Sequence, residues 1–321
     1  MQKYSADISR MKIGRRPDIK QIVGGGVLAI VLVAALISIG SNPRFEWPTV
    51  GEYLFHPSIM TGLLMTLQLT AIAMTVGIVV GVFVALMLLS KNKVVYSIAW
   101  GFTWIMRAVP TLVQLIFWFN LGALYPEITF GIPFFEPFIA LDANVAITPL
   151  TAAILGLGLH EGAYMAEIVR GGLQAVPKGQ TEAGLALGMS KSLITRRLIL
   201  PQAFRIIIPP TGNQVIGMLK LTSLVSVIAL SDLLYSAQLI YARNFQVIPL
   251  LVVIVLWYLL LTSLLMVGQH FLEKHMAKSD RDLKVASEPL MTDVISTVGD
   301  GETTSLTPRG RGTNGTDGSQ K

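Results

Sequence analysis

Long apolar stretches are the feature that most limits what this chain can fold into. A helix that crosses a bilayer needs about 20 consecutive apolar residues, and the sequence contains about six such stretches. Inside a bilayer each segment must satisfy its own backbone hydrogen bonds, so we expect an all-α, polytopic membrane helical bundle. We place the spans near residues 21–41, 59–89, 108–125, 147–169, 209–230 and 248–270.

Composition agrees with a membrane protein. The chain is 52% hydrophobic and 14% charged, whereas a soluble domain carries about 25% charged residues. Its net charge of +6 does not indicate a nucleic-acid partner, because the Lys and Arg residues flank apolar stretches, where they set orientation and contact anionic lipid. The chain has no cysteine, which excludes disulfides, thiolate metal sites and cysteine nucleophiles. We expect no metal and no cofactor.

The two ends of the chain differ in character. Residues 1–20 are basic, and the apolar run after them is closer in length to a span than to a signal-peptide core, with no small-residue cleavage site behind it. We interpret residues 1–57 as a basic N-terminus, a retained signal-anchor span and an external loop. Residues 279–321 are rich in Ser, Thr, Gly and Asp, so we expect a disordered cytoplasmic tail.

Charges between the spans predict the orientation. The segment 125–147 holds acidic residues and no Lys or Arg, as expected outside, while Lys91 and Lys93 fall on the opposite side. Both termini are then expected in the cytoplasm. Trp100 and Trp104 lie four residues apart within 91–107, which predicts a helix at the membrane interface.

The loop at 170–205 is long, basic and punctuated by glycine. Its small and aliphatic residues at helical spacing predict two short helices with a hinge. Gly184 and Gly188 lie four apart, so one helix would present a smooth face to another subunit. Leu200 precedes Pro201 and is biased away from helix, so we expect a turn there. Two helices at a fixed angle would form a rigid lever.

This loop resembles the cytoplasmic EAA signature of ABC importer permeases. The resemblance is carried by Glu182-Ala183-Gly184, by Gly188, and by the run from Leu198 to Pro201. Other segments narrow it to the polar amino acid uptake group of histidine- and glutamine-type permeases, over about residues 58–275. They are 66–70, 107–115, 163–172, 209–214 and 220–224.

The chain departs from the family pattern at several positions. Gly184 replaces a second Ala and Leu198 an Ile, and Ala108 changes the usual Arg-Gly-Thr-Pro run. Leu221 stands where the family often carries an acidic or amide residue, so no substrate contact is carried over to it.

The resemblance implies a MetI-like permease core over residues 58–278 in the bacterial plasma membrane, with the loop coupling it to ATPase subunits. It also implies two ATP-binding cassette subunits, a second permease subunit, identical or sister, and an extracytoplasmic solute-binding protein as partners. The chain has no phosphate-binding loop of its own, so it is not expected to be an enzyme. The coupling residues implied are Glu182, Ala183, Gly184, Gly188, Leu200 and Pro201.

Polar residues inside spans are candidates for the substrate pathway, because an ionised side chain at mid-span costs about 2.5–3.5 kcal/mol on insertion scales. On a helix, His160, Tyr164 and Glu167 share a face, with Glu161 beside it. We expect acidic groups to bind the ammonium of an amino acid, and Lys220 or Arg107 its carboxylate. The candidates are Gln68, Arg107, His160, Glu161, Tyr164, Glu167, Asn213 and Lys220.

Structural explanations remain open for several of these residues. Thr66, Gln68 and Thr70 are also expected as hydrogen-bonding contacts between helices, and Arg107 could extend to lipid phosphate. Glu167 is close enough to Arg170 in the chain to pair with it. Two Gly-x-x-x-Gly pairs, Gly77 with Gly81 and Gly158 with Gly162, predict close packing between spans.

Two other classes of function compete with the importer. A proton-coupled secondary amino acid carrier would use His160 and Glu161 as a relay and would need no ATPase. A membrane-embedded hydrolase would need a nucleophile with a base or a metal-binding histidine pair, and His56 and His160 are isolated.

Overall fold

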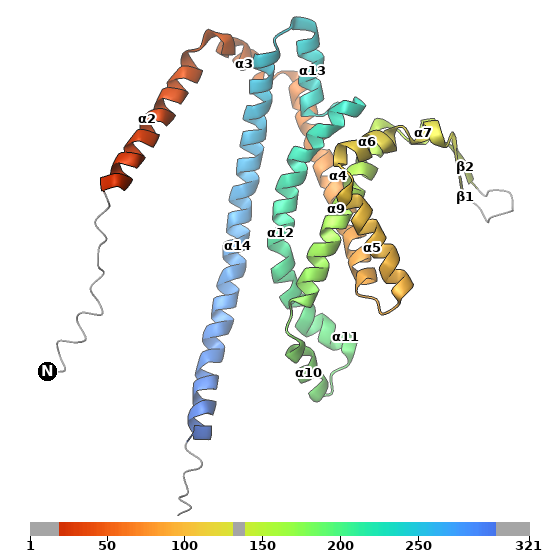
Figure 1. Cartoon of the computed structure of the whole chain (residues 1–321), viewed down its shortest axis with the longest axis vertical. Helices are drawn as coiled ribbons and strands as arrows, with labels where there is room; N and C mark the ends of the chain where they lie inside the picture. The colour runs from red at the N-terminus through yellow and green to blue at the C-terminus, as the bar shows by residue number, and fades with distance from the viewer. Residues whose placement is uncertain (1–18, 131–138, 300–321) are drawn as a thin grey trace, which may run out of the picture. The chain divides into compact units, whose positions relative to one another are not determined.

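The computed structural model describes residues 19–130 and 139–299 and is helical apart from one small hairpin. Its elements (Figure 1) are α2 (Ile19–Ser41), α3 (Trp47–Leu54), α4 (Pro57–Leu88), α5 (Lys93–Ala108), α6 (Thr111–Phe119), α7 (Leu121–Leu124), β1 (Glu127–Phe130), β2 (Ile139–Asp142), α8 (Ala143–Ala146), α9 (Pro149–Gln174), α10 (Lys178–Ala186), α11 (Lys191–Ile194), α12 (Leu200–Leu221), α13 (Leu233–Asn244) and α14 (Val247–Gly299).

About six units are long enough to cross a membrane. Within the described ranges, α2, α4 and α14 each qualify by length and apolar composition. Two bent pairs add up to two more, α5 with α6 and the segment Lys191–Ile228 with α13. Helix α9 is too polar for that test, but its 26 residues span about 39 Å, more than the hydrocarbon core of about 30 Å. The expected polytopic helical bundle is confirmed.

The span expected at 108–125 is wrong. The chain bends by 103° between α5 and α6, and α6 is only 9 residues long. The break falls at Val109 and Pro110, because proline disfavours helix in the residue before it and has no N–H of its own to donate.

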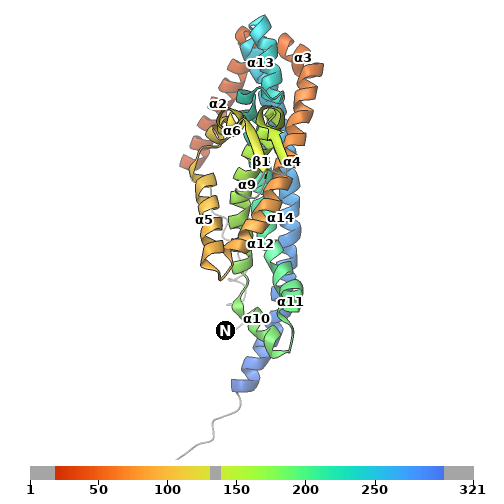
Figure 2. The same cartoon turned by 90° about the vertical axis from the view of Figure 1, so that its right-hand side faces the viewer.

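Helix α5 also differs from the interface helix expected at 91–107. It packs lengthwise against α4 and α9 (Figure 2), with Ala99 and Thr103 buried. Trp100 and Trp104 do share one face, as predicted, and their rings stack on the exposed side.

Helices α4 and α9 form the centre of the bundle, and glycines determine how closely they approach. A Cβ added at Gly158 would lie 2.7 Å from Val76 Cγ1, and one added at Gly162 would lie 2.7 Å from Val80 Cγ1. Met165 of α9 occupies in the same way the space that a side chain at Gly81 would need. The predicted close packing between these spans is therefore confirmed, and we call this contact the α4–α9 seam.

A second core lies where α3 and the start of α4 meet α13 and the start of α14. Val50, Ile59, Leu233 and Leu250 are buried there. The indole Nε1 of Trp257 donates to the carbonyl oxygen of Leu54 at 2.8 Å, which ties α14 to the end of α3. Figure 2 shows α13 and the α10–α11 pair at opposite ends of the bundle.

Segments outside the bundle complete the chain. Strands β1 and β2 pair antiparallel, with Glu127 opposite Asp142, so the predicted all-α chain contains one hairpin. The chain divides into two compact units, residues 1–266 and 267–321. In the second unit α14 continues to Gly299, past residue 279, where the sequence predicts the tail to begin. Good helix formers such as Arg281, Leu283 and Lys284 account for the extension. Residues 1–18 and 300–321 lie outside the described residues.

Candidate functional site

Glu161 lies at the centre of the bundle, in the α4–α9 seam. Its side chain packs on Gly77, where an added Cβ would lie 2.5 Å from Glu161 Cγ. The residue is 4% exposed, and the side chain of Gln214 on α12 lies near its carboxylate. The Oε1 atom of Glu161 has no partner among the described residues. A buried carboxylate with a free oxygen is suited to receive a cationic group, because an unpaired buried charge is costly.

His160 makes different contacts from its neighbour Glu161. One ring nitrogen lies 3.2 Å from Thr111 Oγ1 and the other 3.2 Å from the carbonyl oxygen of Met106. Both partners belong to the elbow between α5 and α6. Within the described ranges, no hydrogen bond joins His160 to Glu161, so the proton relay considered above finds no support in these contacts.

Gln114 holds the same elbow. Its Nε2 donates to the carbonyl oxygens of Met106 at 2.8 Å and Val109 at 2.9 Å. These bonds satisfy carbonyls that Pro110 leaves without helical partners. His160 and Gln114 together therefore fix the direction in which α5 ends, and so the position of Arg107.

Arg107, Tyr164 and Glu167 are brought together, as the sequence predicted. The guanidinium carbon of Arg107 lies 5.3 Å from the centre of the Tyr164 ring, and Nη1 lies 3.9 Å from Glu167 Oε1. The Tyr164 ring also lies 5.0 Å from that of His160. Arg107 lies in the last turn of α5, about 21 Å along the helix from Lys93.

Glu167 also pairs with Arg170, as expected from their spacing. Arg170 Nη2 lies 2.5 Å from Glu167 Oε2, and Nε donates to the same oxygen at 3.0 Å. Glu167 therefore joins two arginines in the C-terminal half of α9. A cavity of about 350 Å³ opens beside this group, lined also by Trp100, Thr103 and Trp104.

Three predicted pathway residues do not join either group. Gln68 on α4 and Asn213 and Lys220 on α12 are exposed. Gln68 forms no hydrogen bond within the part of the chain that the structure describes, so it does not hold helices of this chain together. Thr66 does: its Oγ1 accepts from the backbone N–H of Leu233 at 3.0 Å.

In the loop at 170–205, α10 is a short helix as predicted, whereas α11 is the first turn of a longer helix, and the glycines do not form one smooth face. Gly188 lies beyond the end of α10 with a φ of +73°, and the turn is closed by Met189 N–H donating to the Gly184 carbonyl at 3.0 Å. Gly184 faces inward, where a Cβ would lie 2.7 Å from Ile194 Cγ1. The smooth-face interpretation is therefore wrong, because α10 ends before Gly188.

The turn expected at Pro201 is also wrong. Helix runs continuously from Lys191 through a π-helical turn at Thr195–Ile199 into α12. The wider turn lies just before Pro201, where the missing N–H would interrupt an α-helical ladder. Of the predicted coupling residues, Glu182, Ala183 and Pro201 are exposed and Leu200 is half-buried.

Sequence reasoning missed Asp232. It is fully buried, and its Oδ1 accepts from Tyr235 N–H at 2.8 Å, which caps α13. Its Oδ2 and the hydroxyl of Tyr258 lack partners among the described residues. An acidic residue directly before an apolar run is a helix-cap signal that the sequence contains. Among described residues, no group of three His, Cys, Asp or Glu could hold a metal.

Comparison with known proteins gives consistent matches. A family model described as "Binding-protein-dependent transport system inner membrane component" matches residues 77–278. The arginine transport system permease protein ArgU of Corynebacterium glutamicum is 46% identical over 258 residues, 80% of each chain. The nopaline transport system permease protein NocM of Agrobacterium fabrum is 35% identical over 68% of this chain and 90% of its own. The glutamine transport system permease protein GlnP of Escherichia coli is 32% identical, with shares of 73% and 98%.

Solved structures agree with these matches. A crystal structure of an amino acid ABC transporter with histidines aligns with a TM-score of 0.59 at 33% identity, over 69% of this chain and 95% of that one. An inward-facing MetNI methionine ABC transporter aligns with a TM-score of 0.52 at 19% identity, over 68% and 96%. The second match shows a shared fold alone.

Proposed function

Since the chain belongs to the family of binding-protein-dependent transport system inner membrane components, we propose that it is the permease subunit of an ATP-driven importer for polar or charged amino acids. The relatives named above transport arginine, nopaline and glutamine by their descriptions. The chain is a multi-pass membrane protein and forms half of the translocation pathway. It is not itself an enzyme, since ATP is hydrolysed by partner subunits.

Glu161 is the observation that carries this proposal. Its burial in the seam and its free Oε1 place one unneutralised acceptor at the centre of the bundle. The cationic group of an amino acid is the natural partner for such an acceptor. Arg107, supported by Glu167 and Tyr164, then lies deeper along α9, where it would interact with the carboxylate of a passing solute.

The α10–α11 pair is the proposed coupling element. Leu187 is 82% exposed and Leu185 is 48% exposed. Leucines this exposed are unusual in a folded loop that faces water. A groove on an ATP-binding cassette subunit would cover both. The pair is braced by Gly184 against Ile194, so a force on the pair would reach α12 through continuous helix.

The remaining assembly follows from this arrangement. We place both termini and the α10–α11 pair in the cytoplasm, and the hairpin and α13 outside, in agreement with the charges of the loops. Two ATP-binding cassette subunits, a second permease subunit and an extracytoplasmic solute-binding protein complete the importer. Whether the second permease subunit is identical does not affect the chemistry proposed for Glu161.

The test is uptake by the reconstituted assembly in proteoliposomes. Uptake of labelled L-arginine or L-glutamine should require enclosed ATP and the solute-binding protein, and an uncoupler should leave it unchanged. Glu161→Gln should lower uptake at least about tenfold, since a charge-assisted contact contributes about 1.5–3 kcal/mol. Glu127→Gln, which removes an exposed carboxylate on β1, is the matched control. Uptake that continues without ATP, or that Glu161→Gln leaves intact, would refute the proposal.

The proton-coupled carrier has no supporting observation. His160 is bonded to the elbow and not to Glu161, and the relatives are subunits of binding-protein-dependent systems. The uncoupler in the same experiment separates the two functions directly.

A further inference from the structure

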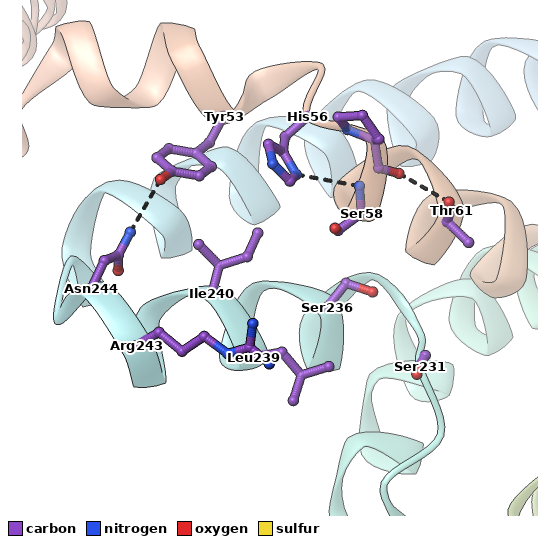
Figure 3. Close-up of a pocket in the computed structure, with 11 residues that line it drawn as sticks. Tyr53, His56, Ser58, Thr61, Ser231, Ser236, Leu239, Ile240, Arg243 and Asn244 are labelled. Carbon is purple, nitrogen blue, oxygen red and sulfur yellow. Dashed lines mark hydrogen bonds between the residues drawn. The ribbon is translucent and has the colours of Figure 1, made fainter.

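A cavity of about 640 Å³ lies at the α13 end of the bundle, far from the α10–α11 pair. Figure 3 shows it between the corner joining α3 to α4 and the side of α13. One wall carries Tyr53, His56 and Ser58, and the other carries Ser236, Ile240 and Arg243. A volume in the range of about 300–1,000 Å³ is typical of small-molecule sites.

The lining has the chemistry of an anion site. Arg243 is its one permanent charge, and no carboxylate is among the residues that line the cavity. The ion pairs within the described ranges involve Arg107, Glu167 and Arg170, so Arg243 is not neutralised by this part of the chain. Arg243 lies in the last turn of α13, where the helix dipole stabilises a cation but provides no anionic side chain to pair with it.

A second observation points into the cavity. Ser236 is 5% exposed, and its hydroxyl lines the cavity without a hydrogen bond to any described residue. It packs directly on Gly62 of α4, where an added Cβ would collide with it. The Oγ of Ser236 is therefore free to donate a hydrogen bond to a molecule in the cavity.

The residues around the cavity favour the transported solute over lipid as its occupant. Thr61 lines the cavity, and Gln68 and Thr75 follow at intervals of seven residues on the same face of α4, all three exposed. This stripe runs about 21 Å along the exposed face of α4 from Thr61. An amide without a partner, such as that of Gln68, is rejected by hydrocarbon and accepted by an aqueous pathway.

We propose that this cavity is an outer subsite that binds the carboxylate of an amino acid before it moves inward, with Arg243 as the anchoring cation and the hydroxyls of Ser58 and Ser236 as donors. The inference rests on the proposed function, since it assumes that solute enters from this end. Arg243 would bind the carboxylate, and Glu161 the cationic group, at different depths of one pathway.

The absence of cysteine from the chain makes a direct test possible. Ser231 lines the cavity and is exposed, so Ser231→Cys supplies the one thiol of this chain, in an importer whose partner subunits are made free of cysteine. Its rate of labelling by a maleimide is measured in proteoliposomes with no addition, with L-arginine, with L-glutamine, or with agmatine. Agmatine keeps the guanidinium of arginine and lacks its carboxylate.

Both amino acids should slow labelling about tenfold at saturation, as expected for a charge-assisted contact, and agmatine should not. Adding Arg243→Gln should abolish the protection, and Arg243→Lys should restore part of it. Arg44→Gln is the matched control, because Arg44 is exposed and does not line the cavity. Equal protection by agmatine, or protection that survives Arg243→Gln, would overturn the proposal.

Two further arms separate the alternatives. If vesicles of phosphatidylglycerol slow labelling relative to phosphatidylcholine and the amino acids add nothing, the bound anion is lipid phosphate and the solute subsite is refuted. ATP-driven uptake is measured in the same vesicles. Uptake without slowed labelling would refute the subsite alone. Slowed labelling without uptake would support the subsite and refute the proposed transport cycle.

Discussion

The α4–α9 seam and the α10–α11 pair use glycine for opposite purposes. In the seam, side chains of the facing helix occupy the space beside glycines 77, 81, 158 and 162. In the pair, Gly184 faces Ile194 and Leu198, Gly188 forms a left-handed turn, and Leu187 is 82% exposed. The seam is complete within this chain, while the pair leaves apolar surface uncovered.

This difference separates stability from coupling. A closely packed interface transmits strain and tolerates almost no added volume. A short element with few internal contacts contributes little to global stability, and its geometry matters mainly to a partner. Substitutions in the two regions should therefore change different measurements.

The largest effect is expected at the seam. Gly77→Leu places a Cβ 2.5 Å from Glu161 Cγ, and overpacking of a tight core costs about 3 kcal/mol. We expect loss of a monodisperse protein in detergent and a lowered thermal midpoint. Gly101→Leu is the control, because nothing lies within 4 Å of a Cβ there. Equal stability of the two variants would show that the seam is not the tight interface described here.

Substitution of Asp232 should give the next largest effect, in a second buried region of the bundle. Asp232→Leu removes the cap on Tyr235 N–H and should cost about 1–2 kcal/mol, as helix caps do. Asp232→Asn keeps a capping oxygen and removes a buried charge, so its thermal midpoint should equal or exceed that of the wild type. A larger loss for Asn than for Leu would contradict a capping role.

Gly188→Val tests the pair, where stability and coupling should diverge. A β-branched residue at a φ of +73° costs about 1–2 kcal/mol locally. The thermal midpoint of the bundle should stay within about 1 °C, since few contacts are involved, while ATP-driven uptake should fall severalfold. Gly188→Asn should retain uptake, because Asn adopts this conformation. Parallel losses of stability and uptake for Val would remove the distinction between the regions.

The smallest effect is expected at Gly184. Gly184→Ala places a Cβ 2.7 Å from Cγ1 of the buried Ile194 and should loosen the pair by about 1 kcal/mol. Limited proteolysis of the loop in the detergent-solubilised protein should then be slightly faster. In an Ile194→Ala background, which lacks Cγ1 and Cδ1, Gly184→Ala should have no further effect, and a further effect there would place the strain elsewhere.

Sequence patterns predicted the bundle well where hydropathy or small-residue spacing decides the structure. The glycine pairs of the seam are of this kind, as is the grouping of Tyr164 and Glu167 on one face of α9. The elbow at Pro110 was missed because 108–125 is apolar enough to be counted as one span, although Val109-Pro110 is a sufficient reason to bend.

Properties that depend on distant segments could not be predicted. The burial of Asp232 depends on α4 and α14, since Thr66 binds the next residue's N–H and Tyr258 lies close to its carboxylate. The separate roles of Gly184 and Gly188 depend on where α10 ends, and a helical wheel assumes that the helix continues. The cavity beside Arg243 forms only when α13 folds back toward α3.

The π-helical turn at Thr195–Ile199 has a consequence for comparing chains of this kind. A π turn holds about one residue more than an α turn, so it rotates everything before it by roughly 100° about the axis of α12. Deleting a single residue there would leave the length of the loop almost unchanged yet direct Leu187 toward a different side. One inserted residue thus sets the direction in which the α10–α11 pair faces around the axis of α12.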